Sequence, residues 1–249
     1  MQRVIQMEIK ENFTNVNIYK NSNRPRYIVI HYFGAFSTAY GVSEWFKNPD
    51  AKASAHYAVD EKDVIYHCVR DQDAAWHCGT TGSLVYTHPY CRNINSIGIE
   101  MRPSKINRNS LNPSDKDWYF DEKVVRNTIE LTVMLMKKYN IPIENVVRHW
   151  DVTGKICPAP YVGAYYNTYY KTTGDLMWKN FKTRLEEALE VRYNKLGEVK
   201  VKSYRETLDK LIKKGLIKGK GGVSDGLVID MGEDMIRTLV ILDRAGKFD

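Results

Sequence analysis

Long apolar runs are missing from this 249-residue sequence. Its longest apolar pieces are short, such as residues 27–30 and 131–136, whereas a transmembrane helix needs about 18 or more apolar residues. The first twenty residues interleave charged and polar side chains and contain no apolar segment of the kind found in a secretory signal. We therefore expect a protein made in the cytoplasm without a signal peptide and with no membrane partner.

Cysteine is scarce, and no two cysteines form a CxxC pair. A protein made without a signal matures in a reducing compartment, so a disulfide framework is not expected. Packing, reactivity and metal binding remain as roles for the four cysteines, which are Cys68, Cys78, Cys91 and Cys157.

The composition is that of a folded protein with a basic surface. With 43% hydrophobic and 27% charged residues, the chain is neither disordered nor collagen-like, and it is long enough to bury a core. A net charge of +7 suggests an anionic partner, such as nucleic acid, an anionic lipid face or an acidic cell-wall polymer. No nucleic-acid-binding signature accompanies the charge, so we predict no nucleic-acid partner.

Strand and helix patterns predict an α/β domain over residues 1–191, with a central mixed β-sheet flanked by helices. Short β-branched and aromatic runs predict the strands, and apolar residues at helical spacing predict the helices. The predicted strands are residues 26–32, 55–59, 64–67, 97–101 and 146–147, and the predicted helices are residues 43–46, 121–139 and 175–191.

The last part of the chain has a different character. Residues 192–202 are charged and lack periodicity, which is typical of a linker. Residues 203–249 are predicted to form a small, mainly helical module. Its size makes independent stability marginal unless it docks or oligomerises.

A loop after the last predicted strand holds His149, Lys155 and Cys157. A loop of this length can fold the histidine and the cysteine onto one metal, and zinc accepts imidazole and thiolate together. A catalytic zinc needs a third protein ligand, for which His31 at the end of the first predicted strand is the best candidate. The alternative is that both histidines are satisfied strand-end residues and that Cys157 is a small buried hydrophobe. Spacing alone leaves both readings open.

Five motifs in order resemble those of the zinc-dependent type 2 N-acetylmuramoyl-L-alanine amidases, a family of phage endolysins, bacterial autolysins and relatives of the peptidoglycan recognition proteins. The resemblance covers about residues 20–170. The motifs are IVIHY at 28–32, SAHY at 54–57, AWHCG at 75–79, NSIGIE at 95–100 and RHWDVTGKICP at 148–158.

The resemblance implies a Zn²⁺ ion held by His31, His149 and Cys157. It implies hydrolysis of the amide between N-acetylmuramic acid and L-alanine in peptidoglycan, with Glu100 moving the proton of the attacking water. Lys155 would stabilise the oxyanion. Without the resemblance, Glu100 reads as a strand-end carboxylate in solvent, and Lys155 as an exposed loop lysine.

Further positions refine this expectation. His77 resembles a residue that lines the substrate groove, so we predict a substrate-binding role for it, whereas His56 is expected to be structural. Some relatives have a catalytic tyrosine where this chain has Ala55, and we expect Glu100 to supply that function. Others have threonine at the position of Lys155, so a lysine favours the hydrolytic branch.

The predicted function is that of a phage or prophage endolysin that reaches the wall of a Gram-positive host through a holin. The alternative is a non-catalytic peptidoglycan-binding protein, which is weaker because recognition-only relatives typically lose the cysteine ligand. The C-terminal module loosely resembles wall-binding modules of such endolysins. Binding of anionic cell-wall polymers and homodimerisation both remain open for it.

Overall fold

The computed structural model describes residues 8–80 and 82–248 and divides the chain into two compact units. The first unit ends at Leu185, and the second begins at Glu186. Residues 1–7 lie outside the described residues. The expectation that the chain has no signal peptide rests partly on them. Among the described residues, no helix combines the length and the apolar character needed to cross a bilayer.

A six-stranded mixed sheet forms the centre of the first unit, in the order β1-β5-β4-β7-β3-β10. Neighbouring strands are parallel except for β4 and β5, which are antiparallel. The predicted fold class is thus confirmed. The strands are β1 (Glu8–Glu11), β3 (Tyr27–Tyr32), β4 (Tyr57–Val59), β5 (Val64–His67), β7 (Ser96–Met101) and β10 (Val146–Arg148).

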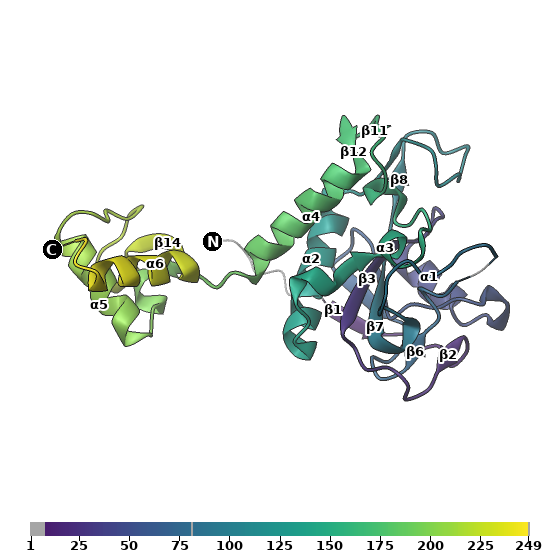
Figure 1. Ribbon diagram of the computed structural model, residues 1–249, viewed down its shortest axis with the longest axis horizontal. Coiled ribbons are helices and arrows are strands. Elements are labelled where there is room, and N and C mark those ends of the chain that lie inside the picture. Colours follow the sequence, from purple (N-terminus) through teal and green to yellow (C-terminus); the bar gives the residue numbers. More distant parts are fainter. Residues whose placement is uncertain (1–7, 81, 249) are drawn as a thin grey trace. The chain divides into compact units, whose positions relative to one another are not determined.

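Helices flank this sheet (Figure 1). Helix α2 packs against β7 and β4, α1 packs against β4 and β5, and α3 packs against β10 and β3. Every residue of β3 is buried, as expected for a continuous apolar strand covered on both faces. The helices are α1 (Ala39–Trp45), α2 (Glu122–Tyr139), α3 (His149–Thr153) and α4 (Gly174–Leu189).

Helix boundaries follow local capping signals. Helix α2 ends at Tyr139, the predicted last residue, and Asn140 follows it in a left-handed conformation with φ of 51°. Helix α1 begins four residues before the predicted Ser43, because the side chain of Thr38 accepts a hydrogen bond from the N–H of Gly41 and caps the helix there.

Short elements complete the first unit. Their strands pair as β2 with β6, β8 with β9, and β11 with β12, all antiparallel. These strands are β2 (Ile18–Tyr19), β6 (Ala74–Ala75), β8 (Ser104–Lys105), β9 (Trp118–Tyr119), β11 (Tyr166–Asn167) and β12 (Thr172–Thr173), and the 3-10 turns are η1 (Pro49–Ala51), η2 (Asn93–Asn95), η3 (Ile143–Asn145) and η4 (Ala159–Tyr161).

The second unit combines two helices with a two-stranded sheet. Strand β13 (Arg192–Lys195) pairs antiparallel with β14 (Val228–Gly232), and η5 (Leu196–Glu198) follows β13 directly. The prediction of a linker over residues 192–202 is therefore wrong for its first part, because Tyr193 and Leu196 pack against the core of this unit. The remaining elements are α5 (Lys202–Lys213), η6 (Ser224–Gly226) and α6 (Glu233–Arg244).

Candidate active site

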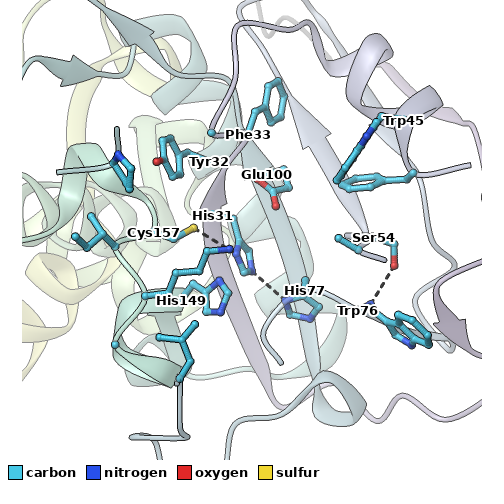
Figure 2. A pocket seen from close by; sticks show the side chains of 18 residues that line it. His31, Tyr32, Phe33, Trp45, Ser54, Trp76, His77, Glu100, His149 and Cys157 are labelled. Carbon is cyan, nitrogen blue, oxygen red and sulfur yellow. Dashed lines mark hydrogen bonds between the residues drawn. The ribbon is translucent and has the colours of Figure 1, made fainter. Parts of the chain in front are cut away.

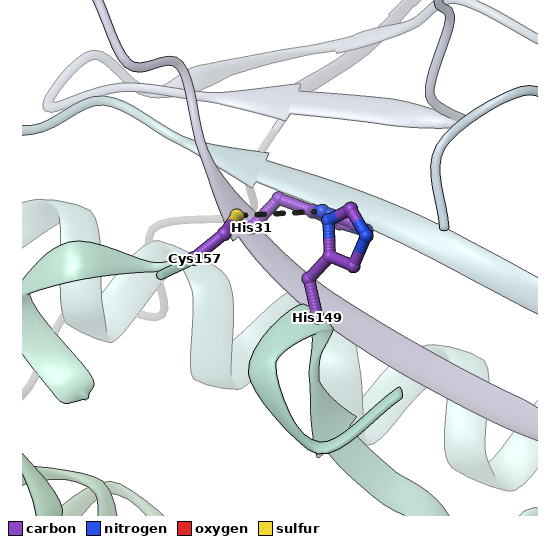
Figure 3. A group of neighbouring side chains, drawn as sticks. All are labelled: His31, His149 and Cys157. Carbon is purple, nitrogen blue, oxygen red and sulfur yellow. Dashed lines mark hydrogen bonds between the residues drawn. The ribbon is translucent and has the colours of Figure 1, made fainter. Parts of the chain in front are cut away.

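Three potential metal ligands meet at one edge of the sheet (Figure 3). His31 lies near the end of β3, and His149 follows β10 as the first residue of α3. Because β3 and β10 are parallel neighbours, their carboxyl ends lie side by side. Cys157 comes from the loop after α3, and one ligand atom from each of the three residues lies within 4.8 Å of the others.

The loop after α3 returns Cys157 to the strand ends. Gly154 ends the helix in a left-handed conformation, with φ of 74°. The N–H of Trp150 then donates a hydrogen bond of 2.8 Å to the carbonyl oxygen of Cys157 and closes the loop. At the start of the same segment, Arg148 and Asp151 form an ion pair at 2.7 Å. The loop is thus held at both ends.

The chemistry of the three side chains suits a zinc ion. All three are buried, and the Sγ of Cys157 lies 3.6 Å from Nδ1 of His31. Burial, followed by the charges of Lys155 and His77, lowers the pKa of His149 to about 3. Burial also lowers the pKa of His31 well below its ordinary value. Both imidazoles are therefore neutral near pH 7, as zinc ligands must be.

An unsatisfied nitrogen supports the same fit. Nε2 of His149 is buried and has no hydrogen-bond partner in the described part of the chain. Such a group is costly to bury unless something else satisfies it. Burial and the nearby Glu100 raise the pKa of the Cys157 thiol to about 12, so the metal-free site holds a thiol and two neutral imidazoles.

Glu100 faces the same cavity as the three potential ligands (Figure 2). It pairs with His31 across β7 and β3, which places both side chains on one face of the sheet. Burial raises the pKa of Glu100 to about 8, and the charge of Lys155 opposes this shift. Its Oε2 has no hydrogen-bond partner among the described residues.

The cavity has a volume of about 500 Å³ and holds the predicted site residues together. Lys155, which is exposed, lines it beside the potential ligands. Aromatic side chains form much of the remaining wall, among them Trp45 and Trp76. A cavity with an apolar wall and a few convergent polar groups is the usual form of a substrate site.

His77 lines the cavity, but its ring nitrogens contact protein atoms. Nδ1 lies 3.0 Å from Nε2 of His31, and Nε2 lies 3.1 Å from Oγ of Ser96. Ser96 was not predicted as a site residue, although it lies two residues before Gly98 and four before Glu100 and therefore shares their face of β7. That spacing was the available signal.

His56 lies behind the site. Its Nδ1 accepts a hydrogen bond of 3.0 Å from the N–H of Gly98, and its Nε2 lies 3.0 Å from the carbonyl oxygen of Asp73. These contacts to backbone groups give His56 the structural environment that the sequence predicts. Cys68, Cys78 and Cys91 are buried in apolar clusters of the first unit.

Known proteins resemble a large part of this chain. Residues 21–160 match the model of a family described as N-acetylmuramoyl-L-alanine amidase. The chain is 29% identical over 168 residues to the N-acetylmuramoyl-L-alanine amidase CwlL of Bacillus licheniformis, a match covering 63% of this chain and 43% of CwlL. It is 32% identical over 163 residues to CwlH of Bacillus subtilis, a match covering 60% of this chain and 55% of CwlH.

A solved structure shares the fold of the first unit. The chain resembles a mutant endolysin from Bacillus subtilis with a TM-score of 0.52 and 27% identity, over 72% of this chain and 98% of that one. The chain spans only part of the two curated relatives, namely 43% of the length of CwlL and 55% of the length of CwlH.

Proposed function

Because the chain belongs to the N-acetylmuramoyl-L-alanine amidase family, we propose that its first unit hydrolyses the amide between N-acetylmuramic acid and L-alanine in peptidoglycan. One observation carries the proposal. His31, His149 and Cys157 are buried with their ligand atoms close together, and Glu100 lines the same cavity. These three residues would hold a zinc ion. Bound zinc supplies a Lewis acid and a water of lowered pKa at this place.

Glu100 and Lys155 have complementary roles in the proposed reaction. The Glu100 carboxylate accepts a proton from the attacking water and delivers it to the leaving amine of L-alanine. A carboxyl whose pKa is raised to about 8 is suited to both accepting and releasing a proton near neutral pH. The Lys155 ammonium lines the same cavity and stabilises the negative charge that develops on the carbonyl oxygen.

The test combines metal analysis with product analysis on purified Gram-positive cell walls. The zinc-loaded protein should release new L-alanine amino termini, and chelation should abolish the release. Glu100→Gln should lower the rate by about 10²- to 10⁴-fold while the protein retains its metal. Glu130→Gln, at an exposed position on α2, is the matched control and should leave the rate unchanged.

Two results would contradict the proposal. If zinc-loaded protein binds walls but releases no L-alanine termini, the protein is a non-catalytic peptidoglycan-binding protein. If Glu100→Gln cleaves as fast as the wild type, Glu100 has no part in the proton transfer.

For the second unit we propose binding to anionic cell-wall polymers. Exposed lysines lie at the end of α5 and in the segment after it. A catalytic unit tethered to the wall through them would act at a raised effective concentration on an insoluble substrate. These lysines are Lys213, Lys214, Lys218 and Lys220.

The competing role for the second unit is homodimerisation. Changing Lys213 and Lys218 to glutamate in the full chain should weaken pelleting with walls, and the loss should be greatest at low salt. Sedimentation analysis of the same variants gives the oligomeric state. A dimer that persists while wall binding is unchanged would favour the dimer role.

We also propose that the protein is a phage or prophage endolysin of a Gram-positive host, in line with the endolysin among its structural relatives. It would then reach the wall through a holin. Expression in a Gram-positive cell should cause lysis only when a holin or another permeabilising agent is present. Lysis without permeabilisation would contradict this route.

A further inference from the structure

A chain of hydrogen bonds begins at the side of His31 that faces away from Cys157 (Figure 2). Nε2 of His31 lies 3.0 Å from Nδ1 of His77, and Nε2 of His77 lies 3.1 Å from Oγ of Ser96. The Ser96 hydroxyl in turn lies 2.7 Å from the carbonyl oxygen of Arg92. His31, His77 and Ser96 are all buried, so bulk water does not compete for these contacts.

The last acceptor of this chain fixes the direction of every bond. A carbonyl oxygen only accepts, so Ser96 donates its single hydroxyl proton to Arg92. Oγ of Ser96 then accepts from Nε2–H of His77. A neutral imidazole carries one N–H, so Nδ1 of His77 is an acceptor and His31 donates to it through Nε2–H. Nδ1 of His31 therefore carries no proton, and its lone pair faces Sγ of Cys157 at 3.6 Å.

We propose that His77 and Ser96 are positioning residues for His31, which fix its ring orientation and keep its Nδ1 lone pair directed at the metal position. A hydrogen bond from the other ring nitrogen of a histidine ligand orients its ring and raises metal affinity. Both ring nitrogens of His77 are engaged within the protein, so His77 acts on the reaction through His31 and not through a ring contact with the substrate. The inference rests on the proposed metal site.

The surroundings of His77 hold its ring in place. A Cβ built on Gly98 would lie 2.7 Å from Cγ and Nδ1 of the His77 ring, so only glycine leaves room for the ring here. On the backbone side, the N–H groups of His77 and Cys78 donate to Oδ1 of Asn93, at 3.2 and 2.8 Å. The ring therefore lies against β7, and Asn93 anchors the backbone that carries it.

Two amide substitutions test the two ring nitrogens of His77 one at a time. In His77→Asn the amide oxygen replaces Nδ1 and can still accept from His31. In His77→Gln the amide nitrogen replaces Nε2 and preserves only the contact with Ser96. Competition with a zinc chelator should show about a 10- to 100-fold loss of zinc affinity for His77→Gln. His77→Asn should retain most of the wild-type affinity, and Ser96→Ala should fall between the two.

The KM for soluble wall fragments at saturating zinc distinguishes a positioning role from a substrate-binding role. We expect an unchanged KM in His77→Gln once zinc is saturating. A raised KM with unchanged zinc affinity would overturn the proposal and would return His77 to substrate binding. Circular dichroism confirms that each variant is folded before it is scored.

The metal-free wild type provides a test that needs no variant. Long-range ¹H–¹⁵N correlation spectra at pH 7.5 should show both His31 and His77 protonated on Nε2 and unprotonated on Nδ1. Protonation of either ring on Nδ1 would overturn the inference. If the tautomers and zinc affinities are as expected but walls yield no L-alanine termini, the proposed function fails while the positioning role stands.

Discussion

Asp71 joins the sheet to α2 through four hydrogen bonds to a single carboxylate, whose side chain is only 7% exposed. It accepts from the hydroxyl of Tyr57 at 2.8 Å and from Nε2 of His67 at 3.1 Å, in β4 and β5. It also accepts from Nζ of Lys138 at 2.8 Å and the hydroxyl of Tyr139 at 2.5 Å, at the end of α2. Burial opposes ionisation, but these donors outweigh it and hold the pKa of Asp71 well below its usual range.

Asp71→Asn keeps the size of the side chain but replaces one acceptor oxygen with a donor NH₂. Hydrogen bonds to charged groups contribute about 1.5–3 kcal/mol each, although Lys138 is half-exposed and its bond contributes less. Losing the two bonds to one oxygen should cost about 3 kcal/mol of unfolding free energy. For a unit of this size, that corresponds to a fall in Tm of about 6–12 °C.

The effect should depend on pH in a defined direction. A carboxylate with a depressed folded-state pKa stabilises the protein fully above its unfolded pKa of about 3.9, and this stability is lost as the pH falls toward the folded pKa. Wild type and Asp71→Asn should therefore differ most at pH 6–7 and converge as the pH falls below about 4.

Tryptophan fluorescence isolates the relevant transition, because all five tryptophans lie in the first unit. Asp63→Asn is the matched control. Its ion pair with Lys123, at 3.0 Å, is half-exposed, so its loss should cost less than about 1 kcal/mol. Equal Tm values for wild type and Asp71→Asn at pH 7, or a difference that grows as the pH falls, would refute the reasoning.

Three further predictions concern the site. Lys155→Met should lower the rate of wall cleavage by about 10²-fold without changing Tm, because it removes only an exposed cation from the cavity, as initial rates would show. Gly98→Ala should destabilise the first unit by about 1–3 kcal/mol in urea titrations, because its Cβ would overlap the His77 ring. Removing zinc by dialysis against a chelator should lower the fluorescence-detected Tm, and adding zinc back should restore it.

Strands with continuous apolar runs could be predicted from the sequence, because burial on both faces leaves a clear signal. Every residue of β3 is buried, and the prediction for this strand is only one residue too long at its start. β5 matches its predicted range although it is only partly buried. Strand β13 could not be predicted, since Arg192–Lys195 is polar and pairs with residues more than thirty positions later in the chain. Pairing with β14, and not the residue pattern of Arg192–Lys195, makes this segment a strand.

The site was predictable where a short loop carries several reactive residues. His149, Lys155 and Cys157 lie within nine residues, so their meeting follows from local chain reach. The hydrogen-bond chain behind His31 was not predictable, because its members come from three separate segments. The same holds for Asp71, whose partners lie between 4 and 68 residues away in the sequence.

Strand β7 links the stability of the sheet to the geometry of the site. Ser96, Gly98 and Glu100 alternate along it and share one face, where they hold His77, leave room for its ring and place a carboxylate in the cavity. The register with β3 sets Glu100 opposite His31. A slip of one residue would turn all three side chains to the opposite face. Because β7 is paired on both sides by parallel strands, with buried isoleucines between these residues, the packing of the core itself keeps the candidate catalytic groups aligned.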